Sequence, residues 1–162
     1  MASQDFMQRI LKGVQSVVSH EGFVMRRNAF IRECNDVLLL IHIQRSSNTT
    51  KDKLIVTVNL GIFSKPLSEI YGNTVNIWSC HWNLRIGHLL PDCRDKWWKA
   101  TNTTEADEAT AEIQRLIQDI AIPELAKRDS TSKLVASWEA GEYGGLTEEQ
   151  RKRYIKAIKG IV

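Results

Sequence analysis

The sequence predicts an α+β fold in which an antiparallel meander sheet of about five to six strands is packed by an N-terminal helix and a long C-terminal helix. Three observations support this prediction. Apolar residues recur every three or four positions towards both ends of the chain, they alternate every second position across the middle, and the middle segments are joined by short turns. Short connections join antiparallel neighbours, which excludes a βαβ array. With 162 residues and 43% hydrophobic composition, we expect one domain with one core.

The first predicted element is an amphipathic helix, whose apolar residues run from Phe6 to Val18 and which Gly22 ends as a C-terminal cap. Strands follow where runs rich in β-formers lie between turn residues such as Asn35-Asp36. The predicted strands are Phe23–Arg26, Ala29–Cys34, Val37–Arg45, Leu54–Phe63, Cys80–Arg85 and Lys96–Ala100.

A long helix is predicted to begin near Thr104, whose side chain can accept from the N–H groups of the first turn, and to continue until Pro123 kinks or interrupts it. Two shorter helices follow, from Ser130 or Ser132 to Ala140 and from Thr147 to Lys159. The second begins with a sequence that fits the capping-box pattern.

We therefore expect a single domain over 1–162, made of an α+β core over 1–128 and a C-terminal helical pair over 129–162. Its three cysteines show no CxxC spacing, and its first residues lack a basic stretch followed by an apolar run. The longest apolar stretch, Val37 to Ile41, is far shorter than a membrane span. These features predict a cytoplasmic protein with free thiols and no membrane association.

The charge balance argues against a nucleic-acid partner. The net charge is +3, with 13 Lys/Arg against 8 Asp/Glu in residues 1–99 and 9 against 11 in residues 100–162. This is a mild excess of positive charge rather than the strong basic cluster of a nucleic-acid binder. Trp97 and Trp98 are adjacent on a predicted strand, so their rings point to opposite faces and form no two-ring stacking platform.

Alternation along the predicted strands gathers polar side chains on one face of the sheet. If the apolar rows pack on the helices, the opposite rows converge, because residues two apart share a face. This candidate polar sheet face consists of His42, Gln44, Thr57, Asn59, His81, Asn83 and Arg85, extended by Arg32. Its amides, imidazoles and guanidinium groups are suited to binding a carboxylate or a phosphate.

The alternative interpretation of this face is the solvated side of a half-buried antiparallel sheet, the usual arrangement for such a fold. What favours a binding role is the scarcity of the Lys and Glu residues that usually decorate a solvated face.

No metal site or catalytic residue is predicted. The cysteines and histidines have no ligand spacing, and the adjacent Cys80 and His81 point to opposite faces of a strand. Cys93 with His88 across the Pro91 turn is a weaker alternative for a nucleophile and its base. We expect the protein to need no cofactor.

A second candidate surface is acidic and lies on the long helix, where Glu105, Glu108 and Glu112 form the densest run of negative charge together with Asp107. Some of these carboxylates also serve the positive end of the helix. The run is therefore either a partner surface or part of the helix start.

Several short motifs along the chain form a recognisable set. They are Val58-Asn59-Leu60-Gly61-Ile62, Cys80-His81-Trp82, Arg85-Ile86-Gly87, Leu90-Pro91, Asp95-Lys96-Trp97-Trp98 and Ile122-Pro123-Glu124-Leu125, with a tail like Ser137-Trp138-Glu139-Ala140-Gly141 and Gly145-Leu146-Thr147. Together these motifs resemble an uncharacterised bacterial family, domain of unknown function 4304. The resemblance covers nearly the whole chain. It implies an intracellular bacterial domain and no particular chemistry.

Two functions from different classes are consistent with these features. We expect a non-enzymatic binding protein, an immunity-type antidote that occludes a bacterial toxin, by analogy with other small domains of this kind. The alternative is a small enzyme or ligand-binding domain that uses the face around His81, Asn83 and Arg85. An enzyme needs a pocket with a titratable group of shifted pKa, whereas an occluding protein needs a broad complementary surface.

Overall fold

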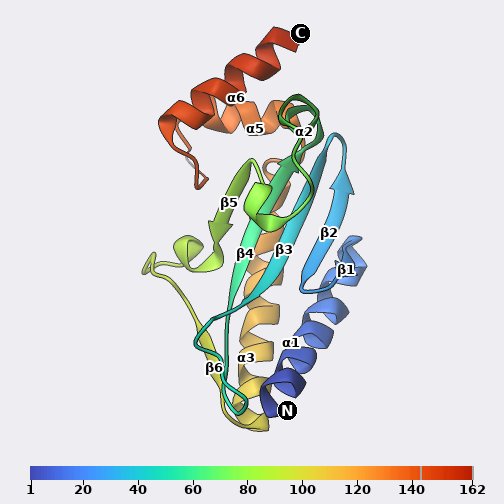
Figure 1. Cartoon of the computed structure of the whole chain (residues 1–162), viewed down its shortest axis with the longest axis vertical. Helices are drawn as coiled ribbons and strands as arrows, with labels where there is room; N and C mark the ends of the chain where they lie inside the picture. The colour runs from blue at the N-terminus through green and yellow to red at the C-terminus, as the bar shows by residue number, and fades with distance from the viewer. Residues whose placement is uncertain (143, 162) are drawn as a thin grey trace.

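The computed structural model describes residues 1–142 and 144–161 and shows a six-stranded sheet with helices α1 and α3 against one of its faces (Figure 1). The helices are α1 (Ala2–Val18), α2 (Lys65–Tyr71), α3 (Thr103–Leu116), α4 (Ile122–Ala126), α5 (Thr131–Glu139) and α6 (Glu148–Ile161). The strands are β1 (Val24–Arg26), β2 (Ala29–Cys34), β3 (Val37–Arg45), β4 (Leu54–Ser64), β5 (Trp82–Arg85) and β6 (Trp98–Ala100). The predicted α+β fold is confirmed.

All neighbouring strands are antiparallel, in the order β1-β2-β3-β4-β5, and β6 pairs with the part of β4 that β5 leaves open. The register places Leu40 opposite Gly61 and His42 opposite Asn59. The fifth strand begins at Trp82, two residues later than predicted, because the 3₁₀ turn Ile77–Ser79 occupies the preceding segment and Cys80 ends it.

The main core lies between the sheet and the two long helices. One buried cluster contains Ile10, Val14, Leu39, Ile41, Val58, Leu60, Trp82 and Leu116. Ile120 is partly buried and packs against the same cluster. The alternation of apolar residues therefore gave the correct inward row on β3 and β4.

The other face of the sheet is covered only in part, by the segment that connects α2 to β5 (Figure 1). Ile77 and Cys80 from this segment pack on Leu40 and Phe63 as a second, smaller cluster. They fit because Gly61 has no side chain: a Cβ there would lie 2.6 Å from the Cys80 Sγ and 2.7 Å from the Ile77 Cδ1. The uncovered remainder of this side is called the open face below.

Helix α2 is an element that the sequence analysis did not predict. The Ser64 side chain accepts a hydrogen bond from the Leu67 N–H, Pro66 lies in the first turn, and Gly72 ends the helix in the left-handed conformation. This sequence of cap, proline and glycine is the ordinary signal for a short helix.

Of the two predicted effects of Pro123, a kink or an interruption of the long helix, the interruption is wrong. Helix α3 passes through a π turn at Ile117–Ala121 and continues as α4, with Pro123 in its first turn. Proline removes a backbone donor and crowds the preceding turn, and the wider π turn accommodates it without ending the helical path.

The C-terminal helical pair lies at the upper end of the sheet in Figure 1. Helix α5 contributes Leu134, Val135 and Trp138 to the main core. The predicted capping box at the start of α6 is confirmed, since the Gln150 N–H donates to the Thr147 Oγ1 at 3.1 Å and the Thr147 N–H donates to the Gln150 side chain at 3.0 Å. None of the described helices is long and apolar enough to span a membrane.

Truncating Leu60 to Ala should lower the free energy of unfolding by about 2–5 kcal/mol, because this side chain is wholly buried between the sheet and the helices. Denaturant unfolding monitored by circular dichroism measures the loss. Val24→Ala on the exposed edge strand is the control and should cost far less. Equal losses for the two variants would contradict the assignment of the strand faces.

Candidate functional site

Four of the predicted polar residues meet on the open face. His42 and Gln44 lie on β3, opposite Asn59 and Thr57 on β4. The Asn59 Nδ2 donates to the Gln44 Oε1 at 2.9 Å and lies 3.2 Å from the His42 Nδ1. The Thr57 hydroxyl is buried and donates to the Lys96 carbonyl at 2.7 Å, so it serves the fold. His42 and Gln44 are half-buried, whereas Asn59 and Thr57 are buried.

The hydrogen bond from Asn59 determines which nitrogen of His42 carries the proton. An amide NH₂ only donates, so the His42 Nδ1 must accept and its Nε2 must carry the hydrogen. Burial lowers the pKa of His42 below its ordinary value of 6.5, which keeps the ring neutral near pH 7. The ring therefore offers one N–H donor on the side away from Asn59.

Arg85 and Asn83 lie on the same side of the sheet as Asn59, since Arg85 pairs with Asn59 and Asn83 with Gly61, whereas Arg32 does not. Arg32 pairs with Leu39 in the sheet, and since Leu39 faces the main core, the placement of Arg32 on the polar face is wrong. Arg85 forms an ion pair with Asp95 at 2.5 Å and lies over the Trp97 ring at 5.1 Å. The Asn83 side chain lies against Gly145, on the loop before α6, and the backbone N–H of Asn83 donates to the Gly144 carbonyl.

The predicted place of His81 beside Arg85 on an exposed face is also wrong, because His81 precedes the strand and turns into the protein with 1% of its surface exposed. Its Nδ1 accepts from the Ser64 N–H at 2.9 Å, and its ring packs against Phe63 and Tyr154. Burial lowers the pKa of His81 to about 4. This histidine joins β4 to α6 and has no access to a ligand.

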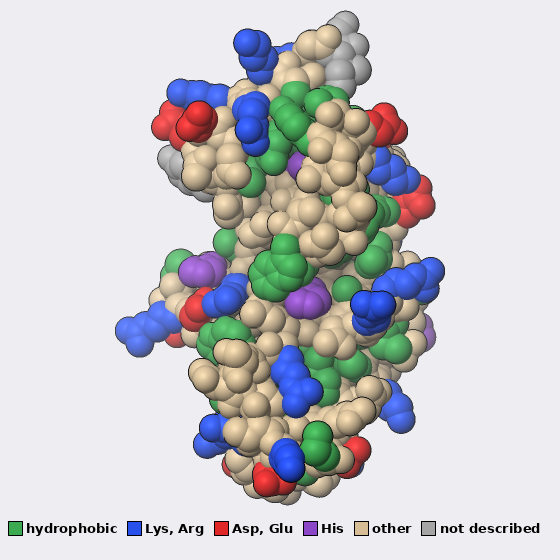
Figure 2. All heavy atoms as spheres, in the orientation of Figure 1, with side chains coloured by type: hydrophobic (Ala, Val, Ile, Leu, Met, Phe, Trp, Pro, Cys, Tyr) green, Lys and Arg blue, Asp and Glu red, His purple; other side chains and the backbone are tan. Residues whose placement is uncertain are grey.

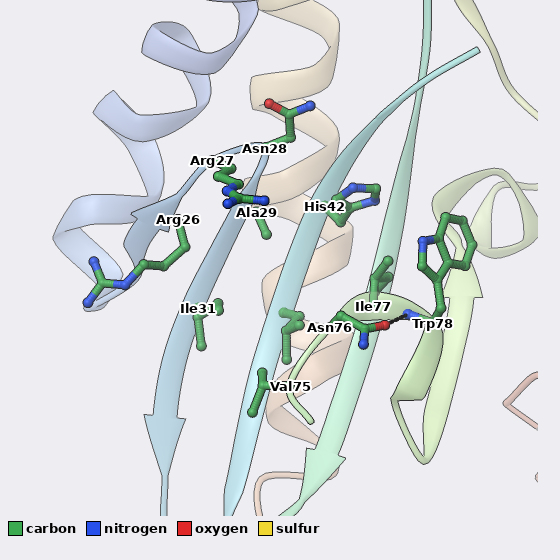
Figure 3. Close-up of a pocket in the computed structure, with 11 residues that line it drawn as sticks. Arg26, Arg27, Asn28, Ala29, Ile31, His42, Val75, Asn76, Ile77 and Trp78 are labelled. Carbon is green, nitrogen blue, oxygen red and sulfur yellow. Dashed lines mark hydrogen bonds between the residues drawn. The ribbon is translucent and has the colours of Figure 1, made fainter. Parts of the chain in front are cut away.

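A groove of about 630 Å³ lies on the open face beside His42 (Figure 3). Its walls come from the β1–β2 turn and from the segment before β5, and its floor from β2 and β3. The lining residues are Arg26, Arg27, Asn28, Ala29, Ile31, Leu40, His42, Val75, Asn76, Ile77 and Trp78. The volume is in the range of sites that bind small molecules or the side chains of a partner.

Trp78 stands at the border of this groove with 67% of its surface exposed. The Asn76 Oδ1 accepts from the Trp78 N–H at 2.9 Å and from the Ser79 N–H at 3.0 Å, so the turn that carries the ring is fixed by its own cap. The ring makes an edge contact with His42 at 5.9 Å between centroids. On its other side Trp78 lines a second hollow of about 110 Å³ with Asn59 and Arg85.

The charge around the groove is positive. Its lining includes Arg26 and Arg27 and contains no carboxylate. Within the described part of the chain, neither arginine has an acidic partner within ion-pair distance. In Figure 2, Lys and Arg side chains gather to the right of the central histidine and hydrophobic atoms. The groove is thus an apolar hollow with unpaired cations at its rim.

The predicted acidic helix face is largely engaged within the protein. Glu105 accepts from the N–H and the hydroxyl of Thr101, and these bonds lower its pKa. Burial raises the pKa of Glu112, but the Lys96 ammonium and the Trp98 N–H outweigh burial and lower it. Glu108 is exposed on α3.

The thiols show no sign of nucleophilic activation. Burial raises the pKa of Cys80 to about 12, which keeps it protonated. Cys93 is exposed, and its Sγ lies 3.5 Å from the His88 carbonyl oxygen, while the His88 ring lies 3.6 Å from Asp95. Among the described residues no group of three or more His, Cys, Asp or Glu side chains is placed to hold a metal ion.

A family model described as Domain of unknown function (DUF4304) matches residues 14–127. The chain belongs to the DUF4304 family. Every residue that lines the groove lies within the matched segment, whereas α5 and α6 lie after it. No protein of curated function and no solved structure matches the chain.

The sequence analysis missed Arg27 and Trp78, the two side chains that most define the groove of this DUF4304 domain. The sequence did contain one signal for Trp78: Asn76 and Ser79 have the spacing of a capping box, which fixes the turn that carries this ring. Arg27 lies in the two-residue turn between β1 and β2 and takes the left-handed conformation, for which the sequence gives no specific signal.

Replacing His81 by Asn should flatten the dependence of stability on pH. The unfolded chain binds this proton near the ordinary pKa of 6.5 and the folded protein only near 4, so stability is full above about pH 6.5 and falls as the pH is lowered towards 4. The Asn side chain can still accept from the Ser64 N–H but does not titrate. As the pH is lowered from 6.5 to 4, the thermal midpoint of the wild type should fall more than that of His81→Asn. If the two midpoints fall in parallel, His81 is not the group responsible.

Proposed function

We propose that this chain is a non-enzymatic binding protein that occludes a protein partner with its open face. The observation that supports this most directly is Trp78, a large apolar ring that is two-thirds exposed yet fixed in position. Exposing such a ring to water is unfavourable unless a partner covers it. Tryptophan and arginine are also the residues most enriched at the energetic centres of protein interfaces.

The surroundings of Trp78 fit an interface centre. The ring borders two hollows, and the groove on one side has Arg26 and Arg27 at its rim. The sheet below is rigid, because β3 and β4 pair along nine consecutive positions. A partner that covers the ring and inserts side chains into the hollows would bury apolar surface without rearranging the backbone.

The chemistry of the groove favours binding over catalysis. Its described lining contains neither a carboxylate nor a thiol, and the one titratable ring in it, His42, is held neutral by burial. An activated nucleophile needs an adjacent base, and this groove offers a base without a nucleophile beside it. The enzyme alternative also relied on His81 next to Arg85, and these two side chains lie in separate surroundings.

As the partner we propose a bacterial toxin, with this protein as its immunity-type antidote in the cytoplasm. The support for this second step is an analogy with other small intracellular domains. The open face is cationic, so the proposed partner presents an acidic surface to it. A nuclease, whose substrate-binding surface is basic, does not meet that requirement.

The test is co-expression with the product of the gene immediately upstream, with cell survival and co-purification as readouts. Trp78→Ala should weaken binding by about 30-fold or more, the effect of losing a central hot spot, and abolish protection. Tyr71→Ala removes another exposed ring, on α2 away from both hollows, and should leave binding unchanged.

The antidote hypothesis fails if no neighbouring product is toxic, or if a toxic one is neither bound nor neutralised. The open-face hypothesis fails if Trp78→Ala binds and protects as well as the wild type while remaining folded.

A further inference from the structure

The groove beside Trp78 combines an apolar floor with hydrogen-bond donors at one end. Ile31 and Leu40 line the floor, and Ile77 lines the adjoining wall. At the end near the β1–β2 turn lie His42, whose Nε2 carries its proton, and Arg27. Figure 3 shows the Arg27 side chain over β2 on the side of His42, whereas Arg26 extends away from that ring.

This end of the groove has an arginine and an imidazole N–H but no carboxylate. Arg85, which lines the neighbouring smaller hollow, is neutralised by Asp95. Within the described residues, Arg27 has no carboxylate within ion-pair distance. The Nε2–H of His42 donates no hydrogen bond to these residues either. A guanidinium and an imidazole N–H beside an apolar floor are complementary to an anion attached to an apolar group.

We propose that this groove binds an aspartate or glutamate side chain of the protein partner, together with an apolar residue next to it in the partner's sequence. The carboxylate accepts from the Arg27 guanidinium and from the His42 Nε2–H, and the apolar side chain lies on Ile31, Leu40 and Ile77 against the Trp78 ring. This assignment rests on the proposed function, since it names the chemistry that the partner presents to the open face.

A carboxylate on a protein fits these observations better than a nucleic acid does. Single-stranded nucleic acids bind along grooves that carry positive charge over several nucleotides and stack successive bases on aromatic rings. Here the cations are confined to one end of the groove, and its lining includes a single tryptophan and no Phe or Tyr. A carboxylate has two oxygens, which matches one guanidinium fork and one further N–H donor.

The experiment titrates the full-length protein with acetyl-Leu-Glu-Leu-amide and follows the imidazole of His42 and the indole N–H of Trp78 by nuclear magnetic resonance. The Glu peptide should shift both signals in a saturable manner below about 10 mM, the weak affinity expected for a fragment of an interface. The isosteric peptide acetyl-Leu-Gln-Leu-amide, which lacks the charge, should bind about tenfold more weakly or not at all.

Protein variants assign the effect to the groove. Arg27→Gln should weaken binding of the Glu peptide about tenfold and remove its dependence on salt, and His42→Phe should weaken it by a similar factor. Arg115→Gln removes the same charge from an exposed position on α3, in the helical layer. It should change neither the affinity for the Glu peptide nor the dependence of that affinity on salt. The thermal midpoints of all variants show whether each is folded.

Three results would overturn the carboxylate assignment. They are equal binding of the Gln peptide, unchanged binding to Arg27→Gln, and tighter binding of a short oligothymidylate at the same signals. None of them affects the proposed function, which is tested separately: a partner whose binding needs Trp78 but not Arg27 would refute the carboxylate subsite and leave the open-face interface intact.

Discussion

The close contact between the turn around Trp78 and Gly61 determines the shape of the open face. Strand β4 is buried along nearly its whole length and pairs with β3 on one side and with β5 and β6 on the other. At Gly61 the Ile77 and Cys80 side chains reach the strand backbone, because no Cβ stands in the way. The turn then seats on the sheet, its cap fixes Trp78, and the groove opens between that ring and the β1–β2 turn. A larger residue would separate the turn from the sheet.

Two histidines with the same protonation state have different roles. Both have a lowered pKa, and in both the Nδ1 accepts a hydrogen bond, from Asn59 in the case of His42 and from the Ser64 N–H in the case of His81. Each ring is therefore neutral and carries its proton on Nε2. What differs is the surroundings of that proton, since His81 is enclosed by Phe63 and Tyr154 whereas His42 lines the groove.

The sequence predicted the fold well where hydrophobic alternation is long and failed where it is short. On β3 and β4 the alternation runs over nine or more residues and gave the correct faces for His42 and Asn59. It failed at His81 because a 3₁₀ turn, whose cap was not recognised, shifts the start of β5. Arg32 was placed on the wrong face, although it lies two residues after Phe30 on β2 and therefore shares its face. Phe30 is a large apolar residue that faces the core, so its position indicated the correct face for Arg32. The groove itself was not predictable, since it depends on a contact between distant segments.

Replacing Gly61 by Ala tests the central role of this contact most directly. The account predicts that the sheet and helices persist, that stability falls, and that nuclear magnetic resonance shows the Trp78 indole and the His42 ring displaced, with partner binding lost although neither side chain is mutated. Gly160→Ala on α6, where a Cβ meets nothing within 4 Å, is the matched control and should alter none of these signals. A Gly61→Ala protein with unchanged stability and unchanged signals from Trp78 and His42 would contradict the account.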